Sequence, residues 1–276
     1  MSDPQDFFSN IKFEPKKTSS EVLNIPEVPE PIIIYSHLHW PELSPADAAL
    51  KFIQNFNGEI NIFTSSFTHA ISPCSVVKHG KTGCQSFIIS LTRDMRNFLN
   101  YQASLLVAHK SKKRPDFFAE IAGKYSEYAG CLLFNSIASY LGFKTRFKPD
   151  FELYADRDLG DIRIGSHILD FKHRNDSNGD GCFLDADYCE KRNLTDDMYF
   201  VHTTGLKKWE IADFKTVNKS YEVAICGFFD KNIFMEKSSL KRNGERRVLD
   251  IQDMCDLEQL FTLVIKGLME EEGYLK

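Results

Sequence analysis

Asp161, Asp170 and Lys172 lie close together in the sequence, and they form the group with the clearest capacity for chemistry. Two runs of alternating apolar and polar residues contain them, and the pair Gly165-Ser166 separates these runs. A Gly-X pair in this place suits a two-residue type II′ turn, so the segment is predicted to form a β-hairpin. The register that follows pairs Ile164 with His167, Arg163 with Ile168, Ile162 with Leu169, and Asp161 with Asp170.

The predicted hairpin has two different faces, because side chains on a strand alternate with a period of two. One face is apolar, is expected to meet the core, and holds Ile162, Ile164, Leu169 and Phe171. The other face is ionic and holds Asp161, Arg163, Asp170 and Lys172.

Opposed carboxylates repel each other across a sheet, so something must offset this repulsion. Mg²⁺ does so well, because it prefers oxygen ligands and is commonly held by one or two carboxylates, water and a substrate phosphate. Lys172 could position a metal-bound water, help to deprotonate it, or stabilise charge on a phosphate. The plainer interpretation is a solvated face with loose ion pairs.

A long helix is predicted before the hairpin, over 117–141, with Gly142 as its stop signal. Its apolar positions recur every three to four residues: Ile121, Ala122, Tyr125, Ala129, Leu132, Leu133, Ile137, Tyr140 and Leu141. Glu127 lies among apolar neighbours on this helix and could add a third carboxylate to the site. A border glutamate in solvent is the competing interpretation, and Glu120 is the competing candidate.

Further elements are expected around the hairpin. A strand over 144–154, interrupted by Pro149, would precede it. A helix around 185–194, a strand over 198–203 and a strand over 221–229 would follow it.

This order of helix, three strands, helix and strand resembles the PD-(D/E)xK nuclease superfamily, the fold of type II restriction enzymes and many repair and phage nucleases. The match depends on Glu127 in the helix, Asp161 on the second strand, and Asp170 with Lys172 on the third. It covers about residues 115–230. The resemblance implies an α/β, restriction-endonuclease-like central mixed sheet flanked by helices, with an added N-terminal region.

The resemblance also implies a role for each residue. Asp161 and Asp170 would bind the metal, Lys172 would be the catalytic lysine, and Glu127 would complete the metal shell. The family's backbone carbonyl ligand would come from Phe171.

One departure from the family motif concerns its proline. Gly160 stands before the first aspartate, whereas Pro149-Asp150 occurs upstream. Asp150 is therefore a rival for the first acidic position.

The composition, with 42% hydrophobic residues, 26% charged residues and a formal net charge of −5, is that of an ordinary intracellular protein. No long apolar stretch or signal-peptide pattern is visible, so a cytoplasmic location without membrane anchoring is expected. The seven cysteines show no CxxC pairing, which predicts reduced thiols. A zinc set of His173, Cys182, Cys189 and His202 lacks the required spacing, and buried cysteines with an exposed histidine are expected instead.

Two basic runs could flank a nucleic-acid cleft, because Lys and Arg supply most of the nonspecific affinity for phosphate backbones. The first run, before the long helix, contains Lys110, Lys112, Lys113 and Arg114. The second, over 237–247, surrounds Asn243-Gly244 and contains Lys241 and Arg242. Either run could instead be a solvated loop.

The chain is expected to divide into a flexible arm over 1–31, a region over 32–114 that could recognise substrate, and a nuclease core over 115–276. In the second region, helices are expected over 46–56 and 92–109, and a strand over 59–67. A C-terminal packing helix is expected within 251–269, and its apolar stripe could also build a homodimer interface.

These features predict a Mg²⁺-dependent DNA endonuclease, with Mn²⁺ able to substitute, that acts on double-stranded DNA through a metal-activated water. A single-strand exonuclease or an RNA nuclease of the same fold is an alternative. A non-catalytic nucleic-acid-binding module is another.

Overall fold

The computed structural model describes residues 43–55, 74–79, 84–109, 117–148, 160–174, 181–191, 194–205, 221–241 and 244–275. Within these residues, six strands form a main sheet in the order β1-β2-β7-β6-β4-β3, and three form a smaller sheet in the order β5-β9-β8.

The strands of the main sheet are β1 (Cys74–His79), β2 (Cys84–Leu91), β3 (Ile162–Ile164), β4 (His167–Arg174), β6 (Met198–Thr204) and β7 (Tyr221–Asp230). Those of the smaller sheet are β5 (Gly181–Asp185), β8 (Ser239–Lys241) and β9 (Arg246–Asp250). The helices are α2 (Pro45–Asn55), α4 (Arg93–His109), α5 (Phe117–Leu141), α6 (Tyr188–Lys191), α8 (Lys231–Lys237) and α9 (Leu257–Glu271), and a 3₁₀ turn, η2, covers Ile251–Asp253.

The main sheet is mixed. β4 and β6 run parallel, whereas the pairs β1–β2, β2–β7, β6–β7 and β3–β4 are antiparallel. Helices flank this sheet, so the predicted α/β class with a central mixed sheet is confirmed. β1 and β2, which precede residue 115, extend the same sheet through the pairing of β2 with β7.

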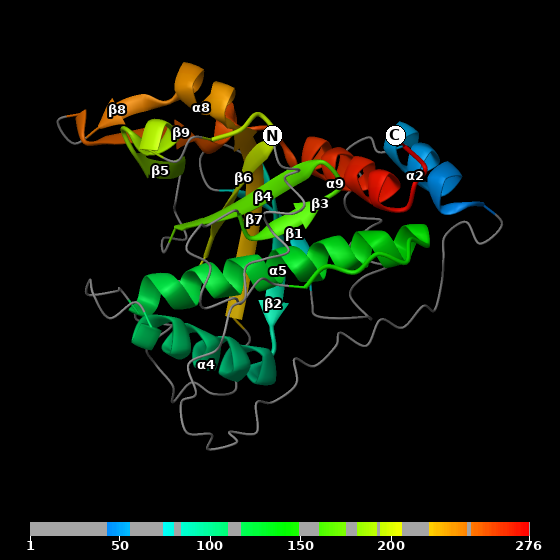
Figure 1. Cartoon of the computed structure of the whole chain (residues 1–276), viewed down its shortest axis with the longest axis horizontal. Coiled ribbons are helices and arrows are strands. Elements are labelled where there is room, and N and C mark those ends of the chain that lie inside the picture. Colours follow the sequence, from blue (N-terminus) through cyan, green and yellow to red (C-terminus); the bar gives the residue numbers. More distant parts are fainter. Residues whose placement is uncertain are drawn as a thin grey trace, which may run out of the picture.

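The two faces of the main sheet bury different clusters of side chains. On one face, α2, α4, α5 and α9 cover the larger core, which includes Leu169, Phe171 and Val201. On the other face, β5, β9 and α8 cover a second cluster that includes Ile168 and Phe200. Figure 1 shows α5 crossing the strands of the main sheet, with the smaller sheet and α8 gathered beside one end of it.

Helix α5 has the predicted bounds. It ends where Gly142 adopts a φ of +83°, and the Phe143 amide donates to the Ala138 carbonyl at 2.8 Å. These two features close the helix in the manner of a Schellman cap. Nearly every side chain from 121 to 141 is buried, because α4 packs on one side of α5 and β4 on the other.

The hairpin forms as predicted in three of its four pairs: Ile162 with Leu169, Arg163 with Ile168, and Ile164 with His167. Gly165 has a φ of +54°, as a primed two-residue turn requires. The fourth pair is absent from the ladder, because Asp161 instead donates its amide to the Leu169 carbonyl at 2.8 Å.

Helix α9 holds the hairpin turn from outside the sheet. The Gly165 amide donates to Glu271 and the Ser166 amide to Glu270, each at 2.8 Å. The apolar stripe of α9 lies in the main core, which confirms a packing helix; its members include Leu260, Val264 and Leu268.

Several elements differ from the sequence prediction. Residues 144–148 form no strand, because side chains bind their backbone groups. Asn135, on α5, binds the amide and the carbonyl of Phe147, and the Glu272 carboxylate accepts hydrogen bonds from the Lys144 and Thr145 amides. The predicted helix over 185–194 shrinks to α6, and β5, β8, β9, α8, β1 and β2 were not predicted. The predicted strand over 59–67 lies outside the described residues.

The ionic face of the hairpin is the main correction. Asp170 is only 3% exposed and Ile168 is buried, because the smaller sheet covers this side of β4. The solvated-face interpretation is therefore wrong for Asp170.

Two glycines of α5 offer a matched test of how closely α5 packs on β4. A Cβ at Gly130 would overlap the ring of Phe171, whereas one at Gly123 would meet no atom within 4 Å. We expect Gly130→Ala to lower the free energy of unfolding by about 1–2 kcal/mol. Gly123→Ala should raise it by about 0.5–1 kcal/mol, since alanine favours a helix interior. Urea unfolding measures both, and equal effects would contradict the contact between Phe171 and α5.

Candidate active site

Asp170 and Lys172 lie on one face of β4 and form a buried ion pair. The Lys172 Nζ lies 2.6 Å from the Asp170 Oδ2, and the side chains are 19% and 4% exposed. Because the residues are two positions apart on a strand, they point to the same side, as predicted.

Asp161 reaches the same strand from its edge. β3 pairs with β4 only as far as Leu169, and just beyond this point the Asp161 Oδ2 accepts a hydrogen bond from the Phe171 amide at 2.6 Å. The amide and carbonyl of a strand residue point to the same side of the strand. The Phe171 carbonyl therefore faces the edge at which Asp161 lies.

The two aspartates are close enough to affect each other's charge. Burial, together with the negative charge of Asp170, raises the pKa of Asp161 to about 7. The Phe171 amide and the positive charges of Lys172 and Lys124 oppose this rise. Near neutral pH the Asp161 carboxyl group is therefore much easier to protonate than an ordinary aspartate.

Lys172 is held in its charged form. Burial alone would lower its pKa, but the negative charge of Asp170, with hydrogen bonds to Asp170 and Tyr188, raises the pKa above its ordinary value. The ammonium group also lies 5.1 Å from the Tyr188 ring centroid and 5.7 Å from that of Phe200, within range of cation–π attraction. A lysine that keeps its proton can stabilise negative charge but is a poor proton acceptor.

Tyr188 is a site residue that the sequence reasoning missed. Its hydroxyl donates to the Asp170 Oδ2 over 3.4 Å, and it comes from α6, beyond β5. The sequence carries no local signal for this contact, because the fold of β5 brings Tyr188 to β4.

On α5, Glu127 is buried, at 1% exposure, so the interpretation as a border glutamate in solvent is wrong; Glu120, the competing candidate, is half-buried. The Glu127 Oε2 lies 2.7 Å from the Nζ of Lys124, one helical turn earlier. The positive charge of Lys124 also lowers the pKa of Asp161. The spacing of three residues between Lys124 and Glu127 was the signal that could have identified Lys124.

A divalent cation fits part of this arrangement. Asp161, Asp170 and the Phe171 carbonyl offer oxygen ligands of the kind that Mg²⁺ prefers, and a partly protonated carboxylate pair is a place where a cation can replace a proton. Among the described residues, no three His, Cys, Asp or Glu side chains gather closely enough to hold a metal ion. Glu127 is thus not grouped with the two aspartates.

The predicted basic runs are only partly described. Lys110, Lys112, Lys113, Arg114 and Arg242 lie outside the described residues, as does the rival acid Asp150. Lys241 is exposed on β8, where it pairs with Arg246 of β9, but it does not line the pocket beside Lys172. Arg246, from the same predicted run, does line that pocket.

Two members of the rejected zinc set, Cys182 and His202, are buried, whereas His173 is half-buried. Cys182 is 2% exposed, as expected for a structural thiol, but His202 is fully buried where an exposed histidine was expected. Burial follows from the β6 position of His202, opposite Lys172 and beneath the smaller sheet.

A comparison of the chain with protein-family models, curated proteins and solved structures finds no match. In the part of the chain that the structure describes, no helix has both the length and the apolar character needed to cross a membrane.

Proposed function

We propose that the protein is a divalent-cation-dependent nuclease that hydrolyses phosphodiester bonds in DNA at Asp161, Asp170 and Lys172. One observation carries the proposal: a partly buried aspartate with a pKa near 7 lies beside a buried aspartate–lysine ion pair at a strand edge. Strongly perturbed acids with a specific charge partner are typical of catalytic sites. A surface ion pair with a purely structural role would instead be exposed to water.

We further propose that the fold is restriction-endonuclease-like. Support comes from the order of elements: α5, then the β3–β4 hairpin with its two aspartates, then β6 parallel to β4. The parallel pair needs a crossover, and β5 with α6 provides part of it.

Each residue then has a role set by its contacts. Asp161 and Asp170 would hold the cation, with the Phe171 carbonyl as a further oxygen ligand at the same edge. Lys172 keeps its proton and stabilises the negative charge that develops on the phosphate during attack by water. Tyr188 and Phe200 keep the Lys172 ammonium in place.

When bound, the cation would polarise the scissile phosphate and make water a better nucleophile. Cation binding requires Asp161 to lose its proton, so the protein's own residues make binding depend on pH. Lys124 favours that loss, because its positive charge lowers the pKa of Asp161.

The proposal predicts DNA cutting that depends on added metal. Purified protein should nick supercoiled plasmid or single-stranded circular DNA with Mg²⁺ or Mn²⁺, and should stop when EDTA removes the metal. Gel electrophoresis follows the products, and circular substrates show endonuclease action directly.

A substrate panel separates the alternatives. Cutting of linear but not circular single strands would indicate an exonuclease, and cutting of RNA alone would indicate an RNA nuclease. Metal-independent DNA binding without cutting of any substrate would contradict the nuclease proposal and favour a binding module.

A further inference from the structure

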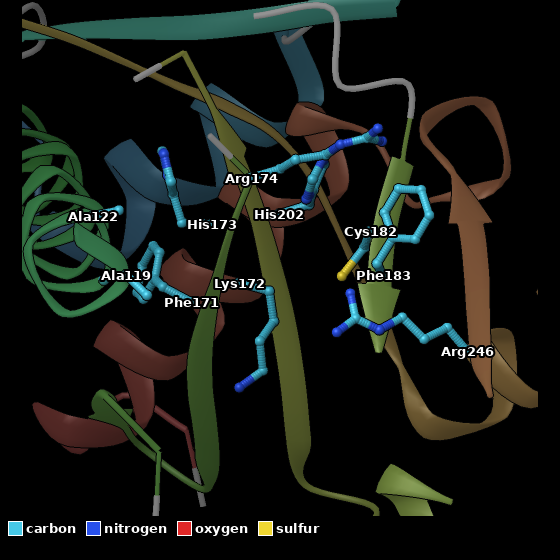
Figure 2. Close-up of a pocket in the computed structure, with 11 residues that line it drawn as sticks. Ala119, Ala122, Phe171, Lys172, His173, Arg174, Cys182, Phe183, His202 and Arg246 are labelled. Atoms are coloured by element: carbon cyan, nitrogen blue, oxygen red, sulfur yellow. The ribbon is translucent and has the colours of Figure 1, made fainter. Parts of the chain in front are cut away.

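A slot beside the acid pair has the size of a small-ligand site. Its volume is about 450 Å³, within the range of about 300–1,000 Å³ typical of such sites. Figure 2 shows the slot with Ala119 of α5 on one side and Phe183 and Arg246 of the smaller sheet on the other. Lys172 also lines it, and because Lys172 binds Asp170, the slot adjoins the proposed cutting site.

The charge of the slot is positive. Arg174 and Arg246 line it, together with Lys172, whose charge is paired with Asp170, and no acidic residue lines it within the described part of the chain. The Arg246 Nε lies 3.7 Å from the Asp185 Oδ1, but these side chains are 45% and 67% exposed, so water screens the pair. His173 adds no charge, since burial lowers its pKa to about 4.

Arg174 is fixed in an orientation suited to anion binding. Its Nη1 donates to the Gly181 carbonyl at 3.1 Å, and its guanidinium lies 4.2 Å from the centroid of the Phe183 ring. A guanidinium held in this way loses little freedom when its planar donors bind a phosphate.

The wall toward α5 is rigid and leaves space. The His173 Nδ1 lies 2.8 Å from the Ser126 hydroxyl and 2.9 Å from the Thr203 hydroxyl, which ties the end of β4 to both α5 and β6. Beyond this network, α5 presents small residues, including Ala122 and Gly123. The slot therefore combines a cationic side with an apolar side, and these complement the anionic phosphate and the flat base of a nucleotide.

We propose that this slot binds the nucleotide next to the scissile phosphodiester and takes it from an unpaired strand. The inference rests on the nuclease function proposed above and narrows its substrate class. Arg174 and Arg246 bind the phosphate of this nucleotide, and its sugar and base lie against the small residues of α5. The volume holds one nucleotide but no base pair with its two backbones, so a duplex must open before it can enter.

Affinity for a labelled oligothymidine tests the slot. Fluorescence anisotropy with EDTA present measures binding to the intact protein, single-stranded or annealed to its complement. We expect Arg174→Gln and Arg246→Gln each to weaken single-strand binding about tenfold, with much less effect on the duplex. The slope of log K against log salt should become shallower by about 0.7 for each phosphate that a variant no longer neutralises. Arg163→Gln, an exposed arginine on β3 outside the slot, is the matched control.

The outcomes separate this inference from the nuclease proposal. Single-strand affinity that is unchanged in both slot variants, or reduced equally for single strand and duplex, overturns the slot assignment even if the protein cuts DNA. Selective loss of single-strand affinity in a protein that cuts no nucleic acid supports nucleotide binding in the slot and contradicts the nuclease. A second measurement is thermal unfolding. Arg174→Gln should keep the wild-type midpoint, which shows that its weaker binding does not come from a loss of folded protein.

Discussion

Metal-dependent DNA cutting is expected to fall by about 10²–10³-fold when Lys172 is replaced by methionine. Methionine keeps much of the length of the side chain but removes the ammonium group that lies 2.6 Å from Asp170. The developing charge on the phosphate would then lose the cation that the proposed function assigns to it. Single-turnover cutting at saturating Mg²⁺ measures this loss without contributions from product release.

The variant also leaves Asp170 buried without its partner. Removing one member of a buried ion pair destabilises the fold, here by about 1–3 kcal/mol because Lys172 is partly exposed. Lys172→Arg provides a second variant that keeps the charge. We expect it to retain most of the stability but not the full rate, since a planar guanidinium cannot occupy the same position between the rings.

Lys191→Met is the matched control, because Lys191 is exposed and binds Asp187 on the surface. It should cut at the wild-type rate. A Lys172→Met protein that is folded and cuts as fast as the control would show that the ion pair is structural.

Replacing Asp161 with asparagine is expected to have opposite effects on activity and on stability. Cutting should be abolished, because an amide binds Mg²⁺ poorly. The metal-free protein should become more stable by about 2 kcal/mol at pH 8. Asparagine can still accept the hydrogen bond from the Phe171 amide, but it carries no charge beside Asp170.

The pH dependence follows from the direction of the pKa shift. Asp161 has a pKa of about 7 in the folded protein and an ordinary value of 3.8 when unfolded. Between these values the folded state binds more protons, so its stability declines as the pH rises from about 4 through 7. The gain from the asparagine variant should therefore be small near pH 4 and largest above pH 7.

Magnesium should reverse the comparison at pH 8. Only the wild-type carboxylate binds the ion well, so added Mg²⁺ should stabilise the wild type and not the variant. Urea unfolding of the wild type and the variant at pH 4 and at pH 8, each with Mg²⁺ and with EDTA, measures these differences in stability. Asp185→Asn, on the exposed rim of β5, is the control; a wild type that Mg²⁺ leaves unchanged would argue against an Asp161 metal site.

Local patterns in the sequence were enough for the hairpin and the long helix. The Gly165-Ser166 turn and the alternation around it determine the register, because a slip of one residue would move every side chain to the other face. Gly142 marks the end of α5 because a left-handed residue closes the helix there. These features depend on neighbours within a few positions.

The surroundings of Asp170 depend on distant segments and were not predictable in this way. β5 and β9, which pair across about sixty residues of chain, cover the face that seemed open to solvent. Tyr188 reaches Asp170 only because of that small sheet. Alternation shows that a strand has two faces but not which of them another segment will cover.

The hydrogen bonds between α9 and the hairpin turn affect the order in which parts of the protein fold. The Gly165 and Ser166 amides find their acceptors more than one hundred positions later, at Glu271 and Glu270. A chain emerging from the ribosome folds its earlier segments first, so the turn stays unanchored until α9 has been synthesised. The carboxylates at the base of the hairpin therefore become fixed late, and an incomplete nascent chain would lack the arrangement of Asp161 and Asp170 on which the proposed cutting depends.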